Sequence, residues 1–239
     1  MWYKLKKIYI RANNQEKQVR PHVPAPTVYE ISYDLRWGSL ADLQAAWFDW
    51  VRTSWSYTFA NDWLQQTSSS NDRGTWVIKK WLDLTNAKKL TAWHIWKWQY
   101  ASWSNGKEIK LCTDITTSSS DISLANPRWD TYFTYSNNNW YRNSELPYVN
   151  ASWTSTVLAR GIATSASWED TITLTIDFEN KTIGWEVAWT NNYTLSANLT
   201  DEQYNATRNM TAIFWWWWRW YHTYDSYERL EEVHLKIEY

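Results

Sequence analysis

The sequence predicts an all-β fold, an antiparallel sandwich of two sheets with one short helix. From about Thr27 onward, short runs of alternating apolar and polar residues are separated by Ser, Thr and Asn, which is typical of a sandwich. The chain shows no regular alternation of strands with long helices, as a parallel α/β sheet would require. Its 239 residues suffice for one large β domain.

The N-terminal part is predicted to lie apart from the sandwich. Residues 1–20 form a basic leader that contains one short strand. Three prolines follow within residues 21–26, and each removes a backbone donor and fixes φ, so this segment is expected to be an extended linker. The sandwich is then expected to occupy residues 27–239.

The clearest strand is 171–178, because Ile172, Leu174, Ile176 and Phe178 alternate with Thr and Asp. A turn and a second apolar run follow directly, which predicts a hairpin. Thr200 with Gln203 matches a capping box, so one helix is expected to start there and run to about residue 209. Strands are expected at 28–35, 75–84, 107–113, 131–135, 156–161, 171–178, 183–188, 193–197, 210–214 and 232–239.

Tryptophan is abundant where glycine is expected. The chain has 23 Trp and 5 Gly, whereas average usage gives roughly 17 Gly for this length. Many Trp fall in segments that resemble turns, namely 61–63, 73–76, 102–106, 137–140 and 215–220. Turns at positive φ select Gly and Asn over bulky rings. We therefore predict that many of these Trp are UGA codons that the source organism reads as glycine; a natural Trp-rich protein is the alternative.

Charge and motif content exclude several functions. The net charge is −1 and the 24 Lys and Arg are scattered, so no nucleic-acid partner is expected. No apolar run approaches the ~18 residues of a membrane span, and the N-terminus lacks the apolar core of a secretory signal. The four histidines, His22, His94, His222 and His234, are dispersed and are each expected at the surface or in a turn, so neither a metal nor a cofactor is predicted.

Cys112 is the single cysteine, which rules out an intrachain disulfide. It ends the alternating segment 107–112. A packed strand thiol is therefore expected rather than a nucleophile.

The order of parts resembles the concanavalin A-like lectin and glucanase superfamily, whose fold is a jelly-roll sandwich. The resemblance rests on an opening strand at 54–64, the hairpin 171–188, the segment 198–203 and the closing run 230–238. With Gly at the Trp positions, 212–221 becomes a glycine-rich loop before the last strand. Residues 4–10 and 18–21 resemble the leader of some phage tail and virion proteins.

The glucanases of this superfamily need carboxylates in the pattern Glu, any, Asp, two any, Glu on one strand. This chain lacks that pattern. Asp177 and Glu179 lie two apart, but they lead into a hairpin where Asp and Asn favour the turn. Glu228, Glu231 and Glu232 are interpreted as a solvated face beside the last strand. No catalytic residue is predicted.

A carbohydrate site is predicted in the aromatic and amide stretch 132–143, at Tyr135, Asn138, Tyr141 and Arg142. Sugars stack apolar C–H faces on aromatic rings, and their hydroxyls bond to Asn and Arg. An ordinary strand and loop would have a similar composition, and that alternative stays open.

These expectations combine into a non-catalytic, carbohydrate-binding adhesin on a phage tail or virion surface. Its partners would be a host-surface glycan and, through the leader, other virion or tail proteins. It would be made in the cytoplasm and act on the virion or another extracellular surface. Two alternatives remain: a glycoside hydrolase or lyase of the same fold, and a structural virion decoration protein without a ligand.

Deletion of residues 1–26 is expected to change the free energy of unfolding by less than ~1 kcal/mol, because the linker holds the leader away from the sandwich. The same deletion should abolish attachment to the virion. Thermal unfolding and a virion-binding assay check the two parts. A large loss of stability would show that the leader packs on the main domain.

Overall fold

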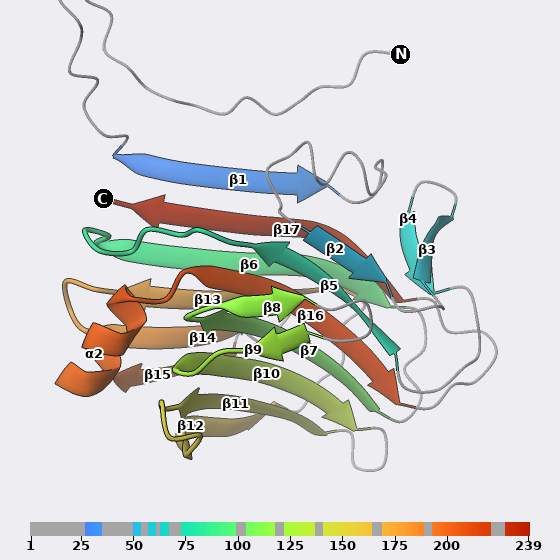
Figure 1. The fold of residues 1–239 in the computed structure, drawn as a ribbon. Helices are drawn as coiled ribbons and strands as arrows, with labels where there is room; N and C mark the ends of the chain where they lie inside the picture. Colours follow the sequence, from blue (N-terminus) through green and yellow to red (C-terminus); the bar gives the residue numbers. More distant parts are fainter. Residues whose placement is uncertain are drawn as a thin grey trace, which may run out of the picture.

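The computed structural model describes residues 27–34, 50–53, 57–60, 63–66, 73–98, 104–117, 122–136, 141–163, 169–188, 193–220 and 228–239. Two large antiparallel sheets pack face to face, with one short helix at one end (Figure 1). This confirms the predicted all-β sandwich. The leader and linker, residues 1–26, lie outside the described residues.

The first sheet, sheet 1, contains the C-terminal strand and the predicted hairpin. Its strands are β1 (Val28–Asp34), β3 (Tyr57–Ala60), β4 (Trp63–Gln66), β6 (Lys89–Trp98), β13 (Glu169–Asp177), β14 (Thr182–Ala188), β15 (Tyr193–Asn198) and β17 (Glu228–Glu238). Their order is β15-β14-β13-β6-β17-β4-β3, and β1 also pairs with β17.

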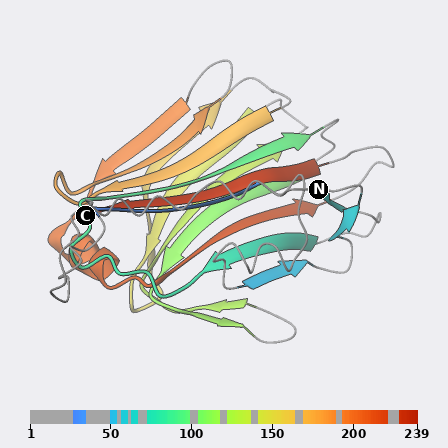
Figure 2. The ribbon, with the colours of Figure 1, turned by 90° about the horizontal axis from the view of Figure 1, so that it is seen from above.

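The second sheet, sheet 2, contains seven described strands. They are β2 (Trp50–Thr53), β5 (Arg73–Lys79), β7 (Ser104–Cys112), β10 (Arg128–Ser136), β11 (Tyr141–Val149), β12 (Ser155–Ala163) and β16 (Ala212–Trp220). Their order is β12-β11-β10-β7-β16-β5-β2, in which β10, β11 and β12 also follow one another in the chain. A two-stranded hairpin of β8 (Ile115–Thr117) and β9 (Ile122–Leu124) lies beside sheet 2 (Figure 2).

The hairpin of β13 and β14 matches its prediction. Ile172, Leu174 and Ile176 are fully buried, Phe178 is 2% exposed, and the intervening Thr residues are only half-buried. Alternation on an extended strand explains this, because successive side chains point to opposite faces. β13 ends at Asp177, whose carboxylate accepts two bonds from Asn180, at 2.9 and 2.8 Å. Asp177 therefore belongs to the turn, as predicted, and so does the exposed Glu179.

Sheet 2 buries apolar residues on both of its faces near the helix end. On one face, residues from three strands join the main core between the sheets: Val77, Ile109, Leu111, Ile213 and Trp215. The alternate positions of the same strands form a second core with β8 and β9: Ile78, Cys112, Ile115, Ala212 and Phe214, with Leu124 packed against it. The β8–β9 hairpin therefore covers an outer face that would otherwise expose apolar side chains.

Helix α2 (Asp201–Arg208) closes one end of the sandwich. The predicted capping box is present: Gln203 N donates to Thr200 Oγ1 (3.2 Å), and Thr200 N donates to Gln203 Oε1 (3.0 Å). The buried Trp129 of β10 donates its Nε1 proton to Thr207 Oγ1 at 2.8 Å. Arg208 stacks over Phe178 and donates to the carbonyls of Leu84 and Ala87. The helix is thus tied to both sheets.

Several of the turns expected in the Trp-rich segments are strands instead. Residues 73–76 lie within β5, and residues 104–106 belong to β7. The expected turn at 61–63 is not contradicted: β3 and β4 flank it and pair with each other, Ala60 with Trp63, and residues 61–62 lie outside the described residues. The expected loop at 215–220 is instead the second half of β16, and Trp215 is fully buried. β16 pairs with β7 on one side and β5 on the other. A central strand satisfies its backbone on both edges, so this segment had no freedom to form a loop.

Other differences concern strand limits and strands not expected. The opening strand at 54–64 is a hairpin, β3 and β4, and the strand expected at 75–84 ends at Lys79. The strands β2, β6, β8, β9 and β11 were not expected. β6 was missed because its inward positions include the small Ala92 and the polar His94, while apolar Trp93 and Ile95 take the alternate positions.

One surface assignment and one strand limit were also wrong. His94 is fully buried in β6, because its position in the alternation faces inward. Glu228, Glu231 and Glu232 lie within β17 and not beside it. His22 and His222 lie outside the described residues. No described helix is long and apolar enough to cross a membrane.

Ile176→Ala is expected to lower the free energy of unfolding by ~2–5 kcal/mol, because it removes buried methyl groups and leaves a cavity. Thr175→Ala is the matched control on the opposite face of the same strand and should cost less than about 1 kcal/mol. Chemical denaturation measures both. Equal losses would contradict the inward assignment of Ile176.

Candidate ligand-binding groove

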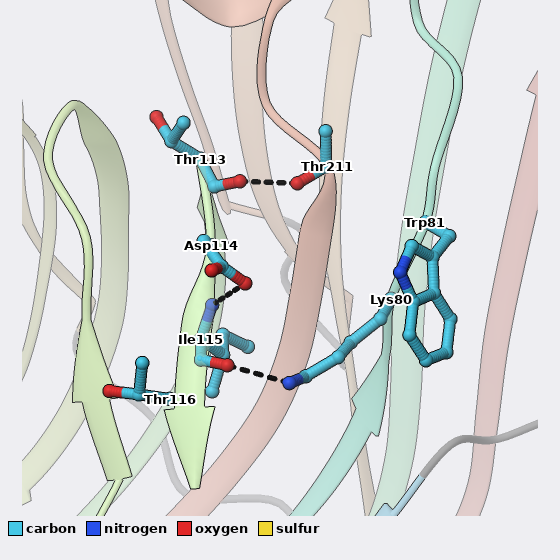
Figure 3. Close-up of a pocket in the computed structure, with 7 residues that line it drawn as sticks. All are labelled: Lys80, Trp81, Thr113, Asp114, Ile115, Thr116 and Thr211. Atoms are coloured by element: carbon cyan, nitrogen blue, oxygen red, sulfur yellow. Dashed lines mark hydrogen bonds between the residues drawn. The ribbon is translucent and has the colours of Figure 1, made fainter.

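An open groove of about 620 Å³ lies where the β8–β9 hairpin meets the helix end of sheet 2. Its walls come from three places in the chain: the segment after β5, the link from β7 to β8 together with the start of β8, and the residue before β16. Figure 3 shows Thr113 to Thr116 along one wall, with Lys80 and Trp81 opposite. The lining residues are Lys80, Trp81, Thr113, Asp114, Ile115, Thr116 and Thr211.

Hydrogen bonds to the backbone fix the shape of the groove. Lys80 Nζ crosses it and donates to the carbonyl of Ile115 at 2.6 Å (Figure 3). Thr211 Oγ1 donates to the carbonyl of Thr113, and Thr113 Oγ1 donates to the carbonyl of Pro127 at 3.0 Å. Because these donors bind main-chain carbonyls, the groove is formed before any ligand arrives.

Asp114 supplies the anionic group of the groove. Its Oδ1 accepts the backbone N–H of Ile115 at 2.7 Å, and its own carbonyl accepts from Ala125 N at 2.9 Å, which closes the base of the hairpin. Asp114 is exposed, and its Oδ2 has no hydrogen bond within the part of the chain that the structure describes. An ionised carboxylate only accepts hydrogen bonds. The groove therefore offers a fixed acceptor to a ligand that donates.

A row of charged side chains continues along sheet 2 from this end. Lys110 Nζ lies 2.7 Å from Glu108 Oε2 and 4.0 Å from Asp130 Oδ1, and Arg128 Nε lies 2.9 Å from Asp130 Oδ2. Each carboxylate of the row thus faces a cation. These contacts indicate a structural ion-pair network rather than two carboxylates held ready for acid and nucleophile roles.

Cys112 lies under the groove in the second core and is fully buried. Its Sγ donates to the carbonyl of Asp114, at 3.3 Å. Burial, followed by the nearby charge of Asp130, raises the pKa of the thiol to about 12. A thiol with this pKa is protonated at neutral pH and is a poor nucleophile. The predicted packed strand thiol is confirmed.

Three of the four residues predicted to bind carbohydrate, Tyr135, Tyr141 and Arg142, lie on strands at the opposite end of sheet 2. Tyr135 of β10 pairs with Arg142 of β11, and Tyr141 is next in register, opposite Ser136. Asn138 and the side chains of the other three lie outside the described residues. β10 starts at Arg128, which pairs with Cys112 beside the groove. Tyr135 is thus roughly 23 Å from the groove end at the rise of an extended strand.

Sequence reasoning did not identify the groove. Asp114 follows the predicted strand 107–113 directly, and a single Asp after a strand is an ordinary turn residue. Only the folding of β8 and β9 over sheet 2 makes it part of a cavity. Among the described residues, no group of three or more His, Cys, Asp or Glu side chains could hold a metal ion.

Comparison with known proteins identifies the fold. No protein-family model and no curated protein matches the chain. The chain is similar to the lectin from Bauhinia forficata in complex with GalNAc, with a TM-score of 0.54 and 13% identity over 87% of this chain and 98% of that one. Peanut lectin has a TM-score of 0.56 and 11% identity, over 87% of this chain and 97% of the lectin chain. The CBM2 module of the evolved Dit of Lactobacillus casei BL23 phage J-1 has a TM-score of 0.55 and 8% identity, over 90% of this chain and 92% of the module. At these identities the likeness establishes a lectin-like β-sandwich.

Cys112 should react with iodoacetamide at pH 8.5 on the order of 10³ times more slowly in the folded protein than in urea. The reason is that its raised pKa removes nearly all thiolate, and burial blocks access. Mass spectrometry of the alkylated fraction over time measures this. Rapid alkylation of the folded protein would contradict the buried position.

Proposed function

We propose that this protein binds carbohydrate in the groove beside Asp114, without catalysing a reaction on it, as an adhesin of a phage tail or virion surface. The observation that carries the proposal is the exposed Asp114 carboxylate, fixed through one oxygen in a preformed groove of a lectin-like sandwich.

The chemistry of the groove suits a sugar. A glycan presents several hydroxyl donors, and a carboxylate oxygen that accepts from none of the described residues can take one of them. Threonine hydroxyls that donate to carbonyls keep acceptor capacity for further sugar hydroxyls. The volume falls within the range of small-molecule sites. The open shape would admit one end of a longer chain.

The setting on a phage is supported by two likenesses. One is the leader, whose residues 4–10 and 18–21 resemble those of phage tail and virion proteins. The other is the phage J-1 module, which shares the fold over most of both chains. On this basis the leader attaches the sandwich to other tail or virion proteins, and the sandwich contacts a host-surface glycan.

Binding without catalysis is favoured over the hydrolase or lyase alternative. Asp177 is engaged by Asn180, whose side chain is the main cause that lowers the pKa of the Asp177 carboxyl. Glu108 and Asp130 face Lys110 and Arg128. Glycoside hydrolysis needs one carboxyl group as an acid and a second as nucleophile or base, whereas these carboxylates are engaged in ion pairs or in a turn. The groove also favours binding over the second alternative, a structural decoration protein, since that function requires no ligand site.

Asp114→Asn is expected to weaken glycan binding by about 10- to 100-fold, because a neutral amide replaces a charged acceptor. Binding is measured by titration calorimetry with a glycan first selected on an array. Asp83→Asn is the matched control: Asp83 is also exposed and its Oδ1 also accepts a nearby backbone N–H, from Thr85 at 3.0 Å, but it does not line the groove. This control should bind like the parent protein.

Two other results would contradict the assignment. If Tyr141→Ala or Arg142→Lys weakens binding while Asp114→Asn does not, the site lies at the far end of sheet 2. If the parent protein binds no glycan, or shortens a polysaccharide, the non-catalytic adhesin is wrong and one of the two alternatives replaces it.

A further inference from the structure

Two exposed tryptophans have a backbone conformation that suits glycine. Among the described residues, three that are not glycine have positive φ: Trp81 at 56°, Trp153 at 63° and Lys181 at 51°. No described glycine has positive φ. The left-handed region is strained for a residue with a Cβ atom, and most of all for a bulky ring, whereas glycine enters it freely.

The turn around residue 153 fixes that conformation. Trp153 N donates to the carbonyl of Asn150, and Asn150 N donates to the carbonyl of Thr154, both at 3.0 Å. Asn150 Oδ1 also accepts from Ser152 N and Thr154 N. A turn followed by one left-handed residue is a common hairpin connection, and its left-handed position is normally glycine. Here it joins β11 to β12.

Residue 81 lies just after β5, where the pairing with the β16 side becomes irregular. Just before it, Lys80 is anchored to Ile115 beside the second core, and just after it Leu82 is buried in the main core, its N–H bonded to the carbonyl of Thr211 at 2.9 Å. Lys79 pairs with Ile213, so the three steps from 79 to 82 lie opposite only two steps on the neighbouring segment, from 213 to 211. One extra residue of this kind is a β-bulge, and its left-handed position is one that glycine normally takes.

Neither indole gains burial in return. Trp81 is 79% exposed and Trp153 is 66% exposed, so both rings lie outside the two cores. Trp153 has Arg128 at 5.3 Å from its ring centre, but an exposed cation–π contact is weak. Lys181, the third residue, differs because its Nζ lies 2.7 Å from Asp201.

Trp129 has the opposite character. It is fully buried in β10, its Nε1 donates to Thr207 Oγ1 at 2.8 Å, and its ring packs on Tyr148 at 4.7 Å between centroids. A glycine there would leave a large cavity and would remove the donor to Thr207 Oγ1, which would keep only its own bond to the carbonyl of Gln203. The structure therefore needs an indole ring at position 129, whereas positions 81 and 153 gain no burial from one.

We propose that residues 81 and 153 are glycine in the protein as its source organism makes it, through UGA codons read as glycine, and that residue 129 is tryptophan. The coding sequence then carries UGA at 81 and 153 and UGG at 129. The groove changes accordingly: the wall opposite Thr113 and Asp114 loses its ring (Figure 3) and becomes wider and more polar. This inference does not rest on carbohydrate binding.

Peptide mass spectrometry of the protein purified from its native source tests the assignment directly. Peptides that contain residues 81 and 153 should have the mass for glycine, and the peptide that contains residue 129 should have the mass for tryptophan. Tryptophan at 81 or 153, or glycine at 129, would overturn the proposal.

Variants of the chain made in a host that inserts tryptophan test the physical reason. Trp81→Gly and Trp153→Gly should each raise Tm by about 2–8 °C, because they relieve left-handed strain. Trp81→Ala and Trp153→Ala are the matched controls, since they remove the ring but keep Cβ, and they should gain less. Trp129→Gly should lower Tm. Alanine variants as stable as the glycine variants would refute the argument from φ, whatever the glycan-binding result.

Discussion

The structure depends on one constraint, the need of sheet 2 to bury both of its faces at the helix end. Alternation sends Leu111 and Ile213 into the main core, and their neighbours Cys112 and Phe214 to the outer face. Apolar side chains on an outer face must be covered. The β8–β9 hairpin provides this cover, and the groove is the junction that the hairpin forms with the rest of the sheet. The candidate site is thus a consequence of how the second core is closed.

The helix end is also where the two sheets are joined by specific bonds. Trp129 reaches from sheet 2 to Thr207 of α2, and Arg208 reaches the carbonyls before β6. Such contacts are directional, whereas the core between the sheets is held by burial without preferred directions. They set the position of α2, and through Met210 and Thr211 they set where β16 begins. The groove therefore has a rigid support on the β16 side.

The same fold supports binding and hydrolysis, so the chemistry of the side chains has to decide between them. Glu108 and Asp130 of sheet 2 lie against Lys110 and Arg128, and Asp177 is bonded to Asn180 in its turn. Asp114 is different, because among the described residues its carboxylate accepts only the N–H of Ile115, and it lines an open groove. With its described lining residues, the groove thus presents a single carboxylate that can accept a hydrogen bond from a ligand. Two-carboxylate catalysis would need a second carboxyl group beside it.

The period-two pattern of the sequence was sufficient where one face is apolar and the other polar. Ile172, Leu174 and Ile176 identified β13, and Thr200 with Gln203 identified the start of α2, because both signals depend on residues close in the chain. β6 gave no such signal, since Ala92 and His94 point inward there. The alternation of residues along one segment does not show which of its faces other strands will cover in the folded protein.

What the sequence alone determined about this protein is its sandwich class, its strongest hairpin, its capped helix, its inert cysteine and the excess of Trp over Gly. Only the tertiary structure decided that 215–220 is a central strand, because pairing with β5 and β7 satisfies its backbone. Only the fold brought Lys80, Asp114 and Thr211 together, since they come from three distant parts of the chain. Backbone φ likewise distinguishes the exposed Trp81 and Trp153, where φ is positive, from the buried Trp129. The sequence could not show this difference, because the backbone conformation of these connections is set by the strands on either side.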